Sequence, residues 1–333
     1  MNITARLRTR VLHTVTAAAV AATAGVLAAP HAAADDLPPG VTKVANSVDV
    51  RCAAFVYHRS SDWYFPTGAA KGLVWLQHGF SRSNGQLGDL AGRYAAAGFL
   101  VFAPTLPSAD LFGCTVSNLG NNTAFLDHVA DLFGKASDPA DKLARSFADA
   151  RTRAGRPDLA LPEGFVFAGH SAGGEAVAYT ANRLRTTYPA AFARLRGLVL
   201  LDPVNSFTGL NMANALNGLA PTPLPMTAIS SPPYTANGNA SGTVELTTDV
   251  HRPFLGVRLT TGSHCDAEGG STDSLCTLLN GTPQARNVAT LQTLAVRWAL
   301  DDVDGTHTAS HYPGGSVYEA LRTDGVVQTL TGS

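Results

Sequence analysis

Charged side chains are scarce in this sequence, and neither sign dominates. Lysine and arginine together number 24 and aspartate and glutamate 25, so the formal net charge is −1. A protein that binds nucleic acid or an anionic membrane through phosphate groups needs an excess of basic residues. The composition therefore predicts no nucleic-acid partner and no electrostatic attraction to a membrane.

Long apolar runs are also few. Residues 15–29 are mostly alanine and valine, three arginines precede them, and residues 32–34 are alanines. This arrangement is typical of a secretory signal peptide, and the run is too short and alanine-rich for a membrane anchor. We expect residues 1–34 to be removed before Asp35. No later run approaches the roughly 20 residues of a membrane span, so the sequence predicts a secreted, soluble protein without stable membrane insertion.

The expected mature chain, residues 35–333, has the length of a single large α/β domain. Removal of residues 1–34 takes away three arginines and no acidic residue, which leaves 21 basic and 25 acidic side chains and a net charge of −4. A domain of this length can bury about three quarters of the surface that its unfolded chain exposes.

Only four cysteines are present, and none belongs to the Cys-x-x-Cys spacing of a zinc site. In an exported chain we expect two disulfides. Proximity in the sequence favours Cys265 with Cys276, which leaves Cys52 with Cys114. Buried free thiols are the alternative.

Apolar runs alternate with amphipathic segments from residue 71 onward, which predicts a mostly parallel central sheet with helices on both faces. An antiparallel edge strand is expected at 47–57, followed by a turn-rich connection at 62–68. Buried strands are predicted at residues 71–80, 100–106, 164–171, 195–204, 225–231 and 256–265. Helices are predicted at residues 84–99, 122–135, 141–154, 172–187 and 286–302.

Residues 205–250 interrupt this alternation. They are rich in glycine, proline, asparagine, serine and threonine, and only 225–231 has the pattern of a strand. We expect an irregular insertion here, either a lid beside a functional site or a surface excursion.

Residues 169–173, Gly-His-Ser-Ala-Gly, fit the G-x-S-x-G nucleophile elbow. In that motif the serine lies on a strained turn between a strand and a helix. Gly169 and Gly173 would flank Ser171 because a β-carbon at either position would collide across the bend. The buried strand predicted before the motif and the helix predicted after it are the context that the motif requires.

A serine hydroxyl needs a base to activate it, and the base needs a carboxylate to orient it. In α/β-hydrolases these groups follow the order Ser, Asp or Glu, then His, at the carboxyl ends of strands. His264 ends the last predicted strand and is the expected base. The competing histidines, which do not follow a strand in this way, are His251, His307 and His311.

Two positions could supply the carboxylate. Asp202 ends the strand after the nucleophile helix, whereas the loop that follows the next strand, residues 231–242, contains no acidic residue. We therefore predict Asp202 as the acid, with Asp249 as the alternative.

The oxyanion of an acyl-transfer intermediate needs two backbone N–H donors. One comes from the residue after the nucleophile and one from the loop after an earlier strand. These positions correspond to Ala172 and to Phe80, which follows His78 and Gly79.

The segments QHGF, GHSAGG, LLDPV and GSHC together resemble a secreted bacterial α/β-hydrolase of the esterase and lipase group. HGF and GSHC are similar to actinobacterial cutinases and polyester hydrolases. The acid in DPV instead resembles that of chlorophyllases and platelet-activating-factor acetylhydrolases, and departs from the position in cutinases. The resemblance implies hydrolysis of a small-molecule, lipid or polyester ester without a metal or cofactor.

Two other function classes stay open. An acyltransferase or thioesterase would use the same Ser, His and Asp, and a noncatalytic binding module could use the same fold. A metal site is not predicted, because His307 and His311 have a ligand-like spacing without the HExxH motif.

Overall fold

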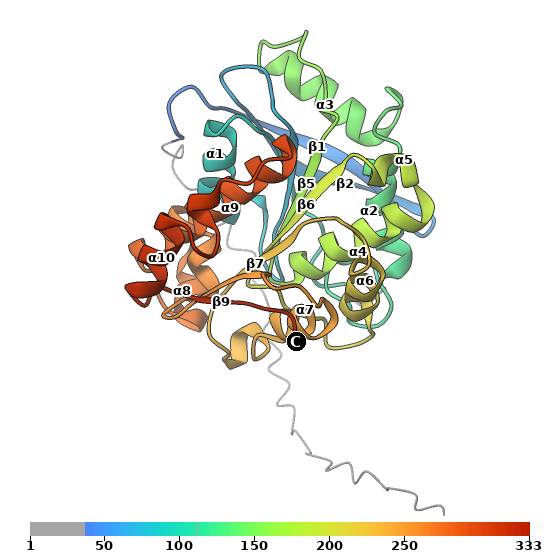
Figure 1. Ribbon diagram of the computed structural model, residues 1–333. Helices are drawn as coiled ribbons and strands as arrows, with labels where there is room; N and C mark the ends of the chain where they lie inside the picture. Colours follow the sequence, from blue (N-terminus) through green and yellow to red (C-terminus); the bar gives the residue numbers. More distant parts are fainter. Residues whose placement is uncertain (1–36, 111) are drawn as a thin grey trace, which may run out of the picture. The chain divides into compact units, whose positions relative to one another are not determined.

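One mixed β-sheet organises residues 37–110 and 112–333, the part of the chain that the computed structural model describes (Figure 1). The predicted signal peptide lies outside the described residues. The strands are β1 (Thr42–Cys52), β2 (Phe55–Phe65), β3 (Leu73–Gln77), β4 (Leu100–Pro104), β5 (Phe165–His170), β6 (Leu195–Leu201), β7 (Met226–Ser230), β8 (Gly256–Leu259) and β9 (Val327–Thr329). Their order across the sheet is β1-β2-β4-β3-β5-β6-β7-β8-β9. The central strands β4 to β8 pair in parallel, and the pairs β1·β2, β2·β4 and β8·β9 are antiparallel.

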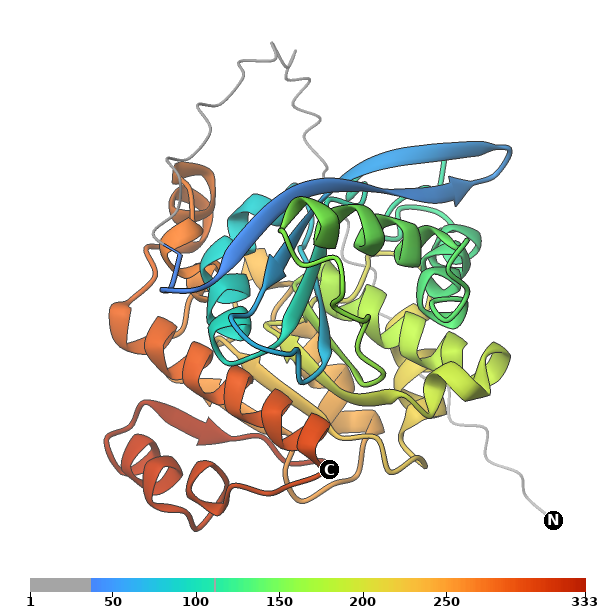
Figure 2. The same cartoon turned by 90° about the horizontal axis from the view of Figure 1, so that it is seen from above.

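Helices cover both faces of this sheet (Figure 2). One face packs against α1 (Gly88–Ala96), α9 (Ala285–Asp304) and α10 (Ser316–Thr323). The other packs against α2 (Thr123–Gly134), α3 (Lys142–Arg153), α4 (Ala172–Thr187), α5 (Pro189–Phe192), α6 (Asn211–Leu219) and α7 (Ser241–Asp249). Shorter elements are α8 (Ser274–Asn280) and the 3-10 turns η1 (Asn84–Leu87), η2 (Thr235–Asn237), η3 (His264–Ala267), η4 (Gly269–Ser271) and η5 (Ala309–His311). The α/β class and the mostly parallel sheet agree with the sequence prediction.

The central strands are mostly apolar because both faces of the sheet are covered. All five residues of β3 are buried. Trp75 packs against Phe133 of α2, with ring centroids 4.8 Å apart. Val74 and Leu76 belong to the cluster on the opposite face. Successive side chains of a strand point to opposite faces, so a continuous apolar run is what a doubly covered strand requires.

The first edge of the sheet differs from the sequence prediction. The expected single strand at 47–57 is a hairpin whose turn includes Ala53, with a φ of 51°. Residues 62–65, predicted as part of a connection, form the end of β2, where Trp63 is fully buried. Aromatic residues pack well on a sheet covered from both sides, which explains why this segment continues the strand.

The stretch 205–250 holds more regular structure than its composition indicates. Besides β7 it contains α6 and α7, which pack against the same face as α4. Met212, Ala215, Leu216 and Leu219 of α6 are buried. This spacing is that of one helix face, and the asparagines between these residues conceal it in the sequence.

Both disulfides form as sequence proximity predicts. Cys52 pairs with Cys114 and Cys265 with Cys276, with Cα–Cα distances of 5.7 and 6.0 Å. The first links the end of β1 to the loop after β4, and the second links η3 to α8. None of the helices within the described ranges is long and apolar enough to cross a membrane.

We expect Asp302, near the end of α9, to make the stability of this fold depend on pH. Its Oδ2 is buried and has no hydrogen-bond partner among the described residues. Burial, together with the charge of Asp301, raises the pKa of Asp302 from 3.8 to about 8. The folded protein therefore binds more protons than the unfolded chain between these values. Its free energy of unfolding falls as the pH rises from about 4 to about 8.

The variant Asp302→Asn should lack this fall, because the amide cannot ionise. At about 1.4 kcal/mol per pKa unit, a shift from 3.8 to about 8 corresponds to at most about 6 kcal/mol. Between pH 4 and pH 9 we therefore expect the free energy of unfolding of the variant to rise by about 2 to 6 kcal/mol relative to that of the wild type. Urea unfolding at both pH values measures this difference. Asp304→Asn, at an exposed position of the same helix, is the control. If the free energies of unfolding of the wild type and of Asp302→Asn change in parallel with pH, ionisation of Asp302 does not destabilise the folded state.

Candidate active site

Ser171 lies on the turn between β5 and α4 with backbone angles of φ 58° and ψ −128°. A side-chain-bearing residue in this region is strained, and such strain is found preferentially at functional sites. The turn is held by backbone hydrogen bonds. Ser171 N–H donates to Leu201 O at 3.0 Å, and Ser171 O accepts from Gly174 N at 2.9 Å and from Val204 N at 3.1 Å.

The glycines around Ser171 are required by close backbone contacts. A β-carbon on Gly169 would lie 2.5 Å from the carbonyl carbon of Gly173, and one on Gly173 would lie 2.6 Å from His78 O. A β-carbon on Gly79 would lie 3.0 Å from Ser171 Oγ. The loop after β3 therefore runs directly against the serine, as a loop that supplies an oxyanion donor should.

His264 and Asp202 meet although 62 residues separate them. Asp202 directly follows β6 and has a φ of 41°, while His264 begins η3 after β8. His264 Nδ1 donates a hydrogen bond of 2.6 Å to Asp202 Oδ2, and both side chains are buried. Burial would raise the pKa of Asp202, but the hydrogen bond and charge of His264 and the hydrogen bonds of Ser231 outweigh it and hold the pKa below its ordinary value. The carboxylate is therefore ionised at neutral pH.

The loop after β7 binds this carboxylate. Ser231 donates from its backbone N–H to Oδ1 of Asp202 at 2.9 Å and from its hydroxyl to Oδ2 at 2.6 Å. Asn237 Nδ2 lies 3.4 Å from both oxygens. Neither Ser231 nor Asn237 belongs to a sequence motif that predicts a site residue. The sequence gives one indirect indication of them: the loop after β7 contains no acidic residue, although this loop is one of the two positions that could supply the acid.

His170, which precedes Ser171 in the elbow, is hydrogen-bonded to the main chain of His264. Its Nε2 donates to the backbone oxygen of His264 at 2.8 Å, and the two ring centroids lie 4.5 Å apart. Burial, then the neighbouring charge of His264, lowers the pKa of His170 well below 6.5. His170 is therefore neutral and acts as a hydrogen-bond donor to the main chain.

Two backbone N–H groups beside Ser171 have no acceptor among the described residues. Ala172 is the first residue of α4, where helical N–H groups have no intrahelical partner. Phe80 lies in the loop after β3, and its N–H also finds no acceptor in residues 37–110 and 112–333. The partial positive charge of the α4 N-terminus adds to the attraction for a developing oxyanion.

A cavity of about 310 Å³ lies beside the predicted nucleophile and base. Ser171 and His264 line it together with the apolar side chains of Phe80, Leu275 and Leu279. Within the described residues no hydrogen bond joins Ser171 to His264. Catalytic hydrogen bonds are often long in the unliganded protein and shorten when substrate binds.

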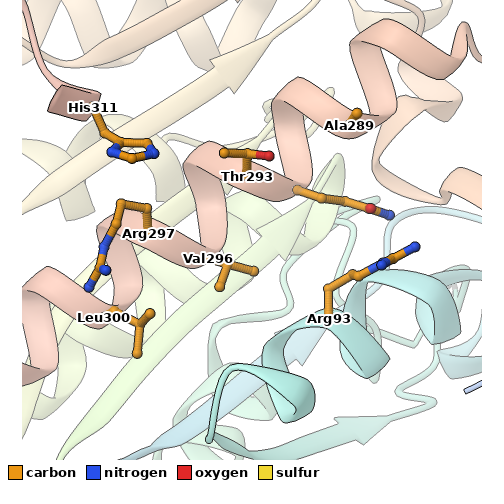
Figure 3. A pocket seen from close by; sticks show the side chains of 8 residues that line it. Arg93, Ala289, Thr293, Val296, Arg297, Leu300 and His311 are labelled. Carbon is orange, nitrogen blue, oxygen red and sulfur yellow. The ribbon is translucent and has the colours of Figure 1, made fainter. Parts of the chain in front are cut away.

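A larger hollow of about 570 Å³ lies elsewhere, along α9 and beside α1 (Figure 3). Its lining includes Arg93, Val296, Arg297, Leu300 and His311. None of the predicted catalytic or oxyanion residues lines it. The smaller cavity is therefore the candidate active site.

The alternative acid and bases have other partners. Asp249 accepts a hydrogen bond from Asn217 at 3.0 Å near the end of α7. The ring of His307 stacks on Tyr312, with centroids 3.9 Å apart. His251 Nδ1 contacts the backbone oxygen of Ser333, and His311 Nδ1 lies 2.9 Å from Ser310 Oγ.

Comparison with known proteins does not supply a function, because neither the family models nor the curated protein sequences match this chain. The structure brings together His264 and Asp202, places Ser171 with His264 in one cavity, and presents the loop of Phe80 to the serine.

Proposed function

We propose that this protein is a serine hydrolase of the α/β-hydrolase fold that cleaves carboxylic esters. The observation that carries the proposal is the 2.6 Å hydrogen bond between His264 and Asp202, beside a serine on a strained strand-to-helix turn. The chain order Ser171, Asp202, His264, with these residues after the carboxyl ends of the parallel strands β5, β6 and β8, supports the fold assignment.

In the acylation step, His264 Nε2 removes the hydroxyl proton of Ser171 as Oγ forms a bond to the ester carbonyl carbon. The carbonyl electron pair moves onto oxygen, and the N–H groups of Phe80 and Ala172 stabilise that oxyanion. The intermediate then collapses and breaks the bond to the alcohol oxygen, which receives the proton from His264 and leaves. Ser171 retains the acyl group.

Water completes the cycle. His264 removes a proton from water as its oxygen attacks the acyl carbon, and the second tetrahedral intermediate expels Ser171 Oγ, which takes the proton back. The sum is one ester and one water converted to an acid and an alcohol. Asp202 stays ionised throughout, holds the imidazole with Nδ1 protonated and stabilises the imidazolium.

The cavity favours an ester with an apolar group next to the scissile bond. Phe80, Leu275 and Leu279 supply its apolar wall and are themselves 50%, 47% and 64% exposed. Binding is favoured when an apolar part of the substrate displaces water from apolar surface in the cavity, because burying that surface lowers the free energy. Two disulfides and the predicted signal peptide support export, since disulfides persist in oxidising compartments.

Covalent labelling tests this proposal. A fluorophosphonate phosphonylates an activated serine, because Oγ bonds to phosphorus and fluoride leaves. We therefore expect the wild-type protein to carry the label on Ser171, as mapped by mass spectrometry of tryptic peptides. His264→Gln should label far more slowly because the hydroxyl is no longer activated. Label on another residue, or ester turnover in a protein that takes no label, would argue against the proposed nucleophile.

A further inference from the structure

Arg82 joins the loop that carries Phe80 to the segment that carries His264. Its Nε donates to one oxygen of Glu268 at 2.7 Å and its Nη2 to the other at 2.6 Å, so the contact is a two-pronged fork. A third nitrogen, Nη1, donates to Asp273 at 3.0 Å. Arg82 and Glu268 are 186 residues apart in the sequence.

This ion pair is buried at the wall of the candidate active site. The side chain of Arg82 is 9% exposed and that of Glu268 is 0% exposed, and both residues line the cavity of Ser171. A fork between a guanidinium and a carboxylate fixes direction as well as distance. The loop of Phe80 and the segment that follows His264 therefore have little freedom to move relative to each other.

Both carboxylates also organise the segment that follows His264. Glu268 accepts a hydrogen bond from Thr272 at 3.0 Å. Asp273 caps α8 by accepting from the backbone N–H of Cys276 at 2.9 Å. Arg82 therefore contacts the part of the chain that begins at the base and continues into the apolar wall of the cavity.

In the loop after β3, Arg82 lies two residues after Phe80, whose N–H is the predicted oxyanion donor. Between them Ser81 has a φ of 57°, a strained conformation for a residue with a β-carbon. Its N–H donates to Ser108 Oγ at 2.9 Å. A strained backbone persists only where its surroundings hold it, and the fork of Arg82 is such a restraint directly next to Ser81.

We propose that Arg82 is a positioning residue: its ion pair with Glu268 holds the backbone N–H of Phe80 where the oxyanion of the reaction develops. The inference rests on the proposed serine hydrolase. An oxyanion donor acts at full strength only within a narrow range of distance to the developing charge. Loss of the fork should therefore weaken binding of the transition state and leave binding of the substrate nearly unchanged.

The test compares kcat, KM and the inhibition constant of a trifluoromethyl ketone, which forms a tetrahedral adduct with Ser171. In Arg82→Lys and Glu268→Gln, we expect kcat to fall about 10- to 100-fold, because a displacement of about 1 Å has effects of this order. KM should stay within about threefold, and the inhibition constant should rise in proportion to the fall in kcat. The near-isosteric Glu268→Gln keeps the test available if a larger change prevents folding.

Two further variants separate positioning from stability. Arg286→Lys alters an ion pair with Asp324 of the same 2.6 Å length, but its side chains are 58% and 59% exposed, so kcat should not change. The double variant Arg82→Met, Glu268→Met removes both buried charges and should recover thermal stability relative to Arg82→Met alone. It should not recover kcat.

An unchanged kcat in Arg82→Lys and Glu268→Gln, a rise in KM alone, or recovery of kcat in the double variant would each overturn the positioning role. These outcomes are distinct from failure of the proposed function. In that case the wild-type protein would not be labelled on Ser171 by a fluorophosphonate.

Discussion

Ser171→Ala is expected to lower the turnover of a p-nitrophenyl ester by about 10⁴-fold or more. The methyl group cannot form the acyl-enzyme, so only the oxyanion donors and binding interactions remain. The structure gives little reason for the variant to unfold, because the backbone hydrogen bonds of the turn do not use the hydroxyl. Steady-state rates and thermal unfolding of the purified protein measure both effects.

The matched control is Ser316→Ala, an exposed serine in the first turn of α10. Its activity should equal that of the wild type. If Ser171→Ala retains more than about a hundredth of the wild-type rate while folded, Ser171 is not the nucleophile.

Asp202→Asn is expected to lower kcat by about 10³- to 10⁴-fold. Ser231 N–H donates to Oδ1 of Asp202, and this donor would select the oxygen of the asparagine for the same position. The amide nitrogen would then face His264 Nδ1 and donate to it. The imidazole would carry its proton on Nε2, the atom that must accept the proton of Ser171. The expected loss is therefore in kcat, with KM little changed.

Asp249→Asn provides the comparison, because it is the other acid that the sequence leaves open. Asp249 is hydrogen-bonded to Asn217, on α6, and not to a histidine, so we expect its removal to leave the rate within about twofold. A crippled Asp249→Asn together with an active Asp202→Asn would show that the acid is assigned wrongly.

Much of the fold follows from local patterns. The sequence predicts a strand at 164–171 and a helix at 172–187, and the structure has β5 at Phe165–His170 and α4 at Ala172–Thr187. A continuous apolar run, a glycine-rich bend and an alanine-rich segment leave few other conformations. The four short segments around Phe80, Ser171, Asp202 and His264 could be identified for the same reason, since each follows a recognisable strand.

The end of β2 could not be predicted in this way. Residues 58–62 are all polar or charged and interrupt the apolar pattern, and a buried carboxylate such as that of Asp62 normally argues against a covered strand. It is tolerated because Lys43 of the neighbouring β1 lies 3.1 Å away. That pairing depends on the register of the hairpin, which brings Lys43 opposite Tyr64, and no local pattern encodes it.

The residues that support the site were missed for a related reason. Ser231, Asn237 and Arg82 lie on loops without periodicity, and their partners are 29 to 186 residues away. A serine or arginine in a loop is usually solvated, so its type carries little information. Only its distance to a carboxylate in the folded protein distinguishes a residue that supports the site from a solvated one.

Local patterns were sufficient to place Ser171 on a glycine-flanked turn, and an acidic residue and a histidine after later strands, in the order expected of a serine nucleophile, its acid and its base. The folded chain brings Asp202, the predicted acid, to 2.6 Å from His264, whereas Asp249, the alternative that the sequence left open, is hydrogen-bonded to Asn217. The tertiary structure alone decided that Arg82 and Glu268 join the loops on the two sides of the cavity. A hydrogen bond between loops that are distant in sequence forms only when its two atoms lie within a few tenths of an ångström of the right separation. The packing of the whole sheet and its helices sets these distances.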